Sequence, residues 1–211
     1  MNLKKELNKV NESFKKAVPK DMIEFFDNEI EKLAKSKLSD SILKVGNIIP
    51  EFSLKNAVGE RVSVYDLLEE GPIILNFYRG SWCPYCNLEL AAYQELLPEI
   101  HARGAQLVAI SPELPDQSLN LIDKHALKYE ILTDSYNKVA KAFGLVFELS
   151  EEMKKVYDTF GIDLEKSQGN TQSELPIPAT FVVNESGKII LGSANIDYRE
   201  RLEPEEAVSV L

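Results

Sequence analysis

Hydrophobic residues at the start of the chain recur with the spacing of an α-helix. They occupy positions 3, 7, 10, 14 and 18, which lie on one helical face, and Pro19 then interrupts the pattern. Asp21, followed three positions later by Glu24, forms a capping-box pattern that predicts a second helix, whose apolar stripe continues to about residue 37. We therefore expect two short helices, which pack either on the rest of the chain or on the second subunit of a homodimer.

The remainder of the chain alternates between short apolar runs and amphipathic segments. The expected strands are 52–54, 61–64, 73–78, 105–110, 130–132, 179–183 and 188–193. The expected helices are 66–70, 84–103, 115–126, 136–143, 150–160 and 203–211, and the polar residues 165–176 are expected to form a mobile loop. This alternation predicts the α/β class, with a mixed, mainly parallel central sheet, helices on both faces and a late antiparallel hairpin. The expected organisation is an N-terminal helical extension, residues 1–45, followed by one domain, residues 46–211.

Composition and charge exclude several kinds of function. The net charge of the 211 residues is −10, which argues against binding to nucleic acid phosphates as the main activity. The sequence has no apolar run of membrane-spanning length, no signal-peptide pattern at its start and no glycine-rich phosphate loop. We therefore expect a cytoplasmic protein without a cofactor.

The chemistry of the sequence is concentrated in Cys83-Pro84-Tyr85-Cys86, which joins a buried strand to a helix. Pro84 suits the first helical position, so Cys83 is expected at the N-cap and Cys86 in the first turn. Unpaired N–H groups and the helix dipole favour a thiolate at this end of a helix, and we predict that Cys83 has the lower pKa, below the usual value of about 8.5. Residues three apart on a helix lie about 5–6 Å apart at Cβ, close enough for a reversible disulfide.

Other roles for these residues stay open at this point. A zinc site needs about four ligands, and His101 lies at the far end of the same predicted helix while His125 is near another helix end. A purely structural role for the two cysteines is a further alternative. Arg79 is either a solvated loop residue or an electrostatic partner of a thiolate, and Trp82 is either a packing residue or part of a docking surface.

The sequence resembles two groups of redox proteins. Cys83-Pro84-Tyr85-Cys86 is similar to the glutaredoxin motif, and Trp82-Cys83 to the thioredoxin site. The wider chain, from residue 46 to about 211, resembles the peroxiredoxins of the alkyl hydroperoxide reductase/thiol-specific antioxidant family, which implies a thioredoxin-like fold. That resemblance is carried by Gly46, Pro50, Phe52 and Leu54, by the strand-to-cysteine segment, by the run 178–183 and by Gly187-Lys188-Ile189.

The site departs from the peroxiredoxin pattern at three positions. In register, Cys86 takes the peroxidatic position and Glu89 follows as the family has it, but Arg79 replaces the motif's proline and Cys83 its threonine. The family's active-site arginine falls on Pro178, which is also where thioredoxins carry a cis-proline. The resemblance to thioredoxin implies a cis Ile177–Pro178 bond beside the cysteines, with the backbone of Ile177 holding a substrate strand.

Three hypotheses follow for the function. The first is an antioxidant thiol peroxidase, in which Cys86 attacks a hydroperoxide and Cys83 resolves the sulfenic acid. The second is a protein disulfide reductase, in which Cys83 attacks and Cys86 resolves the mixed disulfide. The third is a noncatalytic redox-sensing module. For either enzyme the expected reductant is a dithiol such as thioredoxin or glutaredoxin with glutathione. The expected substrate-binding residues are Arg79, Trp82, Pro84, Tyr85, Ile177 and Pro178.

Overall fold

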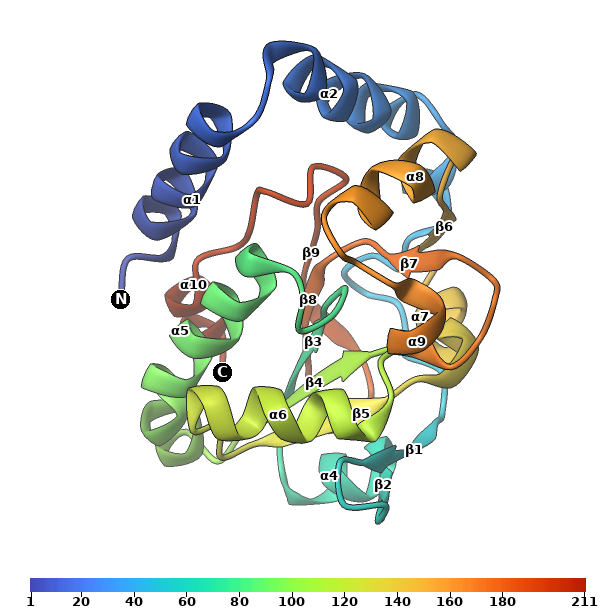
Figure 1. Ribbon diagram of the computed structural model, residues 1–211. Coiled ribbons are helices and arrows are strands. Elements are labelled where there is room, and N and C mark those ends of the chain that lie inside the picture. The colour runs from blue at the N-terminus through green and yellow to red at the C-terminus, as the bar shows by residue number, and fades with distance from the viewer.

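The computed structural model describes all 211 residues and contains a seven-stranded mixed sheet with helices on both faces (Figure 1). The strand order is β2-β1-β5-β4-β3-β8-β9. The strands of this sheet are β1 (Ser53–Asn56), β2 (Arg61–Ser63), β3 (Ile73–Phe77), β4 (Gln106–Ser111), β5 (Glu130–Thr133), β8 (Ala179–Val183) and β9 (Ile189–Ala194). The helices of residues 46–211 are α4 (Val64–Glu70), α5 (Pro84–Ala102), α6 (Pro115–His125), α7 (Lys138–Ala142), α8 (Glu151–Thr159), α9 (Leu164–Gln168) and α10 (Pro204–Ser209), with a 3₁₀ turn η1 (Ser135–Asn137).

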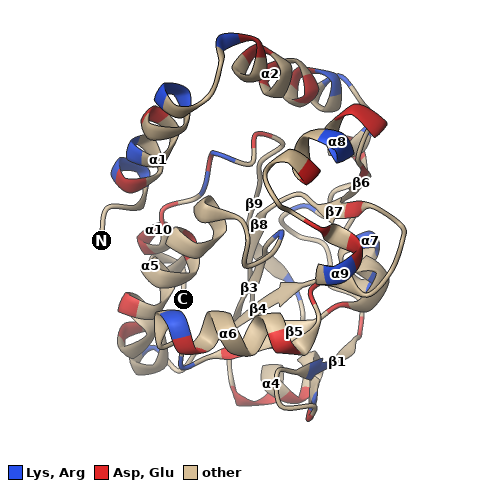
Figure 2. Cartoon of the chain, viewed as in Figure 1, with Lys and Arg blue, Asp and Glu red and all other residues tan.

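The α/β class is confirmed, but parallel pairing is less extensive than the sequence predicted. Only β3–β4 and β4–β5 are parallel. The other four pairings of the sheet are antiparallel, because β1 and β8 both enter in the opposite direction to their neighbours. The central strands β3, β4 and β8 carry no charged residue, whereas charges are spread over the surrounding helices (Figure 2).

Alternation along the central strands builds a core on each face of the sheet. From β3, Leu75 and Phe77 pack with residues of α4 and α7, while Ile74 packs on the opposite face with residues of α5 and α10. Successive side chains of a strand point to opposite faces, so a strand that is buried along its whole length, as β3 is, requires cover on both faces of the sheet. The segment that connects the end of β3 to the start of α5 therefore lies at the edge of this core.

The N-terminal helices pack on the rest of the chain. These are α1 (Leu3–Ala17), α2 (Lys20–Ala34) and the short α3 (Leu38–Ser41). Leu3 and Leu7 are buried in the same cluster as the two cysteines, and Phe26 packs against α8. The predicted capping box is not formed, because α2 starts two residues earlier, with Pro19 rather than Asp21 at its N-cap, and the Asp21 carboxylate accepts the neighbouring N–H of Met22.

The prediction of a mobile loop at residues 165–176 is wrong. This segment contains α9 and the strand β7 (Glu174–Pro176), which pairs with β6 (Val146–Glu148). Hydrogen bonds hold this segment: Asp163, just before it, caps α9, and the buried Ser167 within it donates to Glu113. Polar residues that bind one another in this way can be buried without an apolar pattern. No helix of the structure is both long enough and apolar enough to cross a membrane.

Candidate active site

The connection from β3 to α5 carries both cysteines. α5 begins directly after Cys83 and has Pro84 at its start, as predicted. The turn is tight at Gly80, where a Cβ would overlap the indole of Trp82 and lie 2.9 Å from Glu113 Oε1. The close approach of these two side chains requires glycine at this position.

Glu113, which follows β4, holds this turn in place. Its carboxylate accepts the Ser81 N–H at 2.6 Å, the Ser81 hydroxyl at 3.0 Å and the Ser167 hydroxyl at 2.8 Å. Burial raises the pKa of Glu113, and these donors partly offset the effect. Sequence reasoning did not find this residue, because it has no fixed spacing to the cysteines.

The two sulfurs differ in pKa although both are buried. Both residues are free thiols, with Cys83 1% and Cys86 0% exposed. Burial raises the pKa of Cys83, but a hydrogen bond from Cys86 and the charges of Arg79 and Arg201 outweigh it and bring the pKa to about 6. Burial and the hydrogen bond to Cys83 raise the pKa of Cys86 well above its ordinary value. These directions agree with the prediction that Cys83 is the thiolate.

Arg79 lies beside Cys83 and is not a solvated loop residue. It is 3% exposed, and Nη1 lies 4.0 Å from Cys83 Sγ while Nη2 donates to the Tyr157 hydroxyl. Its Cζ atom lies 4.2 Å from the ring centroid of Tyr198 and 4.9 Å from that of Trp82. An aromatic face attracts a guanidinium, so these rings hold the cation at the sulfur.

A second guanidinium, Arg201, lies at Cys86. Its Nε donates to Glu89 Oε2 at 2.7 Å, and Nη2 lies 3.5 Å from Cys86 Sγ. Burial raises the pKa of Glu89 to about 7, against the lowering effect of Arg201. Arg201 belongs to the loop between β9 and α10, 115 residues after Cys86, and no pattern in the sequence indicated it.

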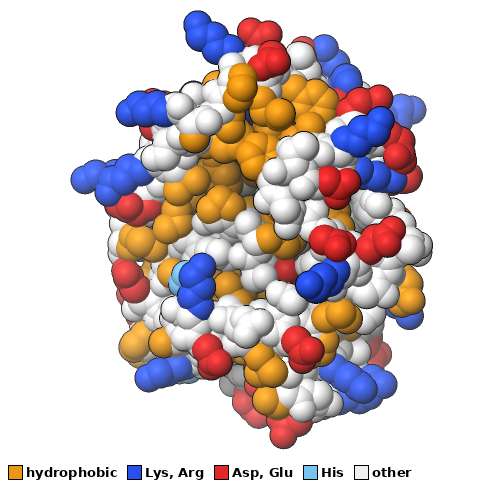
Figure 3. All heavy atoms as spheres, in the orientation of Figure 1, with side chains coloured by type: hydrophobic (Ala, Val, Ile, Leu, Met, Phe, Trp, Pro, Cys, Tyr) orange, Lys and Arg blue, Asp and Glu red, His pale blue; other side chains and the backbone are white.

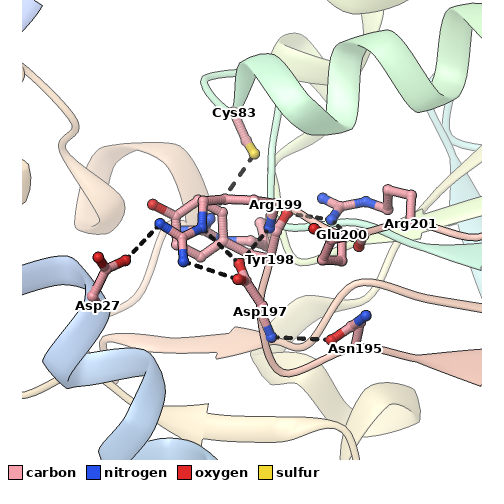
Figure 4. A network of polar contacts seen from close by, with 9 residues as sticks. Asp27, Cys83, Asn195, Asp197, Tyr198, Arg199, Glu200 and Arg201 are labelled. Carbon is pink, nitrogen blue, oxygen red and sulfur yellow. Dashed lines mark hydrogen bonds and ion pairs between the residues drawn. The ribbon is translucent and has the colours of Figure 1, made fainter. Parts of the chain in front are cut away.

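The loop of Asn195 to Arg201 also ties the site to the N-terminal helices. Arg199 donates to Asp27 of α2 at 2.7 Å and to Asp197 at 2.8 Å. Figure 4 shows these residues between α2 and the start of α5, with Tyr198 in the middle of the group. Side chains from α2 and from the loop before α10 therefore meet beside the active site.

Two apolar cavities adjoin the site. The smaller, of 280 Å³, is lined by Cys83 but not by Cys86. The larger, of 360 Å³, extends along α2 and α8, and both have Arg79, Tyr157 and Tyr198 in their walls. A hollow of hydrophobic side chains is visible below α1 and α2 (Figure 3). Of the predicted substrate-binding residues, Arg79, Trp82, Pro84 and Tyr85 line the smaller cavity, and Ile177, Pro178 and again Arg79 line the larger.

The prediction of a cis Ile177–Pro178 bond is wrong. The structure contains no cis peptide bond. Pro176, which precedes Ile177, is paired with Val146 in the two-stranded sheet of β6 and β7. The Ile177 N–H donates to Leu145 O at 2.8 Å. The chain thus runs extended from β7 into β8, and this N–H is not available to a substrate strand.

The fold and the reactive dithiol together define a thiol-based oxidoreductase with a thioredoxin-like architecture. No three His, Cys, Asp or Glu side chains are grouped so as to hold a metal ion. The AhpC/TSA family model matches residues 45–191, and the chain belongs to this family, as its resemblance to peroxiredoxins implied. The match covers α5 and the sheet as far as the first half of β9, but not Arg201.

Individual relatives represent both kinds of thiol chemistry. Thiol-disulfide oxidoreductase ResA of Bacillus anthracis is 22% identical over 162 residues, which are 76% of each protein. Peroxiredoxin Bcp of Escherichia coli K12 is 29% identical over 116 residues, 55% of this chain and 73% of Bcp. The crystal structure of peroxidoxin BcpB from Mycobacterium tuberculosis has a TM-score of 0.63 and 21% identity, covering 79% of this chain and 95% of that one. The protein is an enzyme of the thiol peroxidase or disulfide oxidoreductase type.

Proposed function

We propose that the protein reduces hydroperoxides that carry an apolar substituent, and that Cys83 is the attacking thiolate. The proposal rests on one observation: Cys83, and not Cys86, lines an apolar cavity beside the Arg79 guanidinium. A thiolate is the reactive form of cysteine, and the lowered pKa of Cys83 favours it at neutral pH. This assignment exchanges the roles that the peroxiredoxin register gives the two cysteines.

The first step transfers oxygen to Cys83. Its thiolate attacks one oxygen of ROOH, the O–O bond breaks, and Cys83 becomes a sulfenic acid while RO⁻ takes a proton to become the alcohol. We propose that Arg79, whose Nη1 lies 4.0 Å from the Cys83 sulfur, stabilises the negative charge that moves from the sulfur to the leaving oxygen. Cys86 then attacks the Cys83 sulfur, forming the disulfide and releasing the hydroxyl as water.

The cycle closes when an external dithiol reduces the disulfide. A thioredoxin or a glutaredoxin with glutathione is the reductant we propose. Such reductants are available in a reducing compartment, and we propose the cytoplasm. Ile177 and Pro178, in the wall of the larger cavity, are proposed to contact the apolar part of the substrate.

Reduction of a protein disulfide is the second candidate. It uses the same low-pKa Cys83 backed by a buried Cys86, and the match to ResA favours it. Against it stands the Ile177 N–H, whose bond to Leu145 O removes a donor that a docked strand would use. The first candidate needs no such docking, because a small hydroperoxide fits the cavity.

Single-cysteine variants test the assignment. Cys86→Ser is expected to consume one equivalent of cumene hydroperoxide and to form a sulfenic acid that dimedone traps. Cys83→Ser is expected to react at least about a hundredfold more slowly, because burial still raises the pKa of its remaining thiol, Cys86. If Cys83→Ser forms the trapped sulfenic acid and Cys86→Ser does not, the roles are the reverse. If wild type reduces oxidised insulin but not the hydroperoxide, the second candidate replaces the first.

A further inference from the structure

Every nitrogen of the Arg201 guanidinium has a partner. Its side chain is 2% exposed, and its Nε donates to Glu89, itself 1% exposed. Nη1 donates to the carbonyl oxygens of Tyr198 and Glu200. The remaining nitrogen, Nη2, is directed at Cys86 Sγ at 3.5 Å. Three oxygen acceptors thus hold Nε and Nη1 of Arg201, and this leaves Nη2 directed at the Cys86 sulfur.

Each sulfur is therefore in direct contact with a different cation, although the charges of both guanidinium groups act on both thiols. Arg79 contacts Cys83 from within the cavity wall, whereas Arg201 contacts Cys86 away from it. The other titratable or charged groups that interact electrostatically with Cys86 are Cys83, Glu89, Glu113, Tyr78, Tyr157 and Arg79. Of all these groups, Arg201 is the cation for which a direct contact with the Cys86 sulfur is found.

We propose that Arg201 is a catalytic residue of the second step, in which it stabilises the Cys86 thiolate as this attacks Cys83, and that Glu89 positions it. This inference rests on the proposed order of attack. Arg201 lies outside residues 45–191, so the family match does not assign it a role.

The step balances without an external oxidant. The Cys86 thiol loses a proton, its sulfur attacks the sulfur of the Cys83 sulfenic acid, and the S–O bond breaks. The departing hydroxide takes a proton and leaves as water, and the oxidation carried by Cys83 is now shared between two sulfurs. When a reductant later attacks Cys83, Cys86 departs as a thiolate, and the same guanidinium receives its charge.

The first experiment measures the Cys86 thiol by itself. In Cys83→Ser, thiolate absorbance against pH gives the Cys86 pKa, with and without Arg201→Met. Loss of the cation is expected to raise this pKa by about one unit, a tenfold change in thiolate at a given pH. Arg201→Lys should restore part of the shift, since it keeps the charge without the guanidinium fork. An unchanged pKa would overturn the proposal even if the protein proves to be a peroxidase.

The second experiment separates the two steps in the protein with both cysteines. After one equivalent of cumene hydroperoxide, Arg201→Met should form the sulfenic acid at a rate within about threefold of wild type, because Arg79, which has the larger effect of the two arginines, still lowers the pKa of Cys83. Disulfide closure should slow by about tenfold or more, and its pH dependence should move to higher pH. Closure at the wild-type rate would overturn the proposal. If wild type does not react with hydroperoxide at all, the proposed function fails, and the Cys86 titration still decides the role of Arg201.

Folding is controlled by a paired substitution. Arg201→Met alone leaves the Glu89 carboxylate buried without its partner, which destabilises a folded chain. Glu89→Gln with Arg201→Met removes both charges and should fold while keeping the closure defect. Arg103→Met is the matched control. Arg103 follows the last residue of α5, is exposed and pairs with Glu99, so its loss should change neither step.

Discussion

Cys83 and Cys86 are three residues apart, yet their surroundings differ in almost every respect. Cys83 faces an apolar cavity with aromatic walls, and its cation, Arg79, is held by aromatic faces. Cys86 is sealed in the interior, and its cation, Arg201, is held by a carboxylate. Access distinguishes the two sulfurs as much as charge does. The comparison indicates that the Cys83 sulfur is accessible to a substrate, whereas the Cys86 sulfur can react only with Cys83.

The most direct way to break the comparison is to ask whether the two sulfurs join at all. Mild oxidation is expected to link Cys83 and Cys86 within one chain, because their positions at the start of α5 place them within disulfide reach. Mass spectrometry should find the tryptic peptide Gly80–Arg103 lighter by two hydrogens. Oxidation that yields only intermolecular dimers would contradict the shared cycle, and Cys86→Ser is the control.

Thiol reactivity should separate the sulfurs by a large factor. At pH 7, Cys83 in the Cys86→Ser variant should be alkylated by iodoacetamide about 30-fold faster than Cys86 in Cys83→Ser, because only Cys83 has a lowered pKa and an adjoining cavity. Cys83 should titrate below about 8.5 even without Cys86, because the charges of Arg79 and Arg201 still lower its pKa. Equal rates in unfolded protein provide the control. A faster Cys86 in the folded protein would reverse the assignment of roles.

The smaller cavity beside Cys83 can be opened by a single substitution in α2 that does not touch Cys86. Phe26 of α2 is buried and lines the smaller cavity, so Phe26→Ala should lower the free energy of unfolding by about 3–4 kcal/mol. It should also speed the alkylation of Cys83 without changing that of Cys86. Phe25→Ala is the matched control, because Phe25 lines neither cavity. Equal changes at both cysteines would mean that the cavity is not what distinguishes them.

The smallest effect is expected in the pH dependence of stability, because the contributions of Cys83 and Glu89 have opposite signs and overlap between pH 6 and 7. The pKa of Cys83 is lowered from 9.0 to about 6, so its stabilising contribution is complete above pH 9 and is lost as the pH falls to 6. The pKa of Glu89 is raised from 4.5 to about 7, so its contribution is present below pH 4.5 and is lost as the pH rises to 7.

Denaturant titrations across this range test both signs. Cys83→Ser should remove the rise in stability between pH 7 and 9, and Glu89→Gln should remove the fall between pH 4.5 and 6. Between pH 6 and 7 the two contributions overlap, and wild type should change least. A rise above pH 7 that persists in Cys83→Ser would show that another group carries it.

The sequence predicted the elements that place the cysteines, because each depends on local pattern. The apolar run of β3 and the proline at the start of α5 are sufficient to set Cys83 at the helix start. Most other strands and helices of the domain were also found, within one or two residues at their ends. The parallel pairing was overestimated, because alternation of strands and helices does not report the direction of β1 or β8.

Residues that support the site from a distance could not be predicted. Glu113 and Arg201 reach the site from loops whose course depends on the complete fold. The small sheet of β6 and β7 was missed because its strands have three residues each, too few for a period to be visible.

The loop between β9 and α10 has a consequence for how the chain tolerates change. Within four consecutive positions, Tyr198 lies over Arg79, Arg199 contacts Asp27, and Arg201 contacts Cys86. Each contact depends on its distance along the chain from the end of β9. A deletion or insertion of one residue here would move all three side chains out of register at once, although every residue type were kept. The length of this loop is therefore as strict a requirement as its composition.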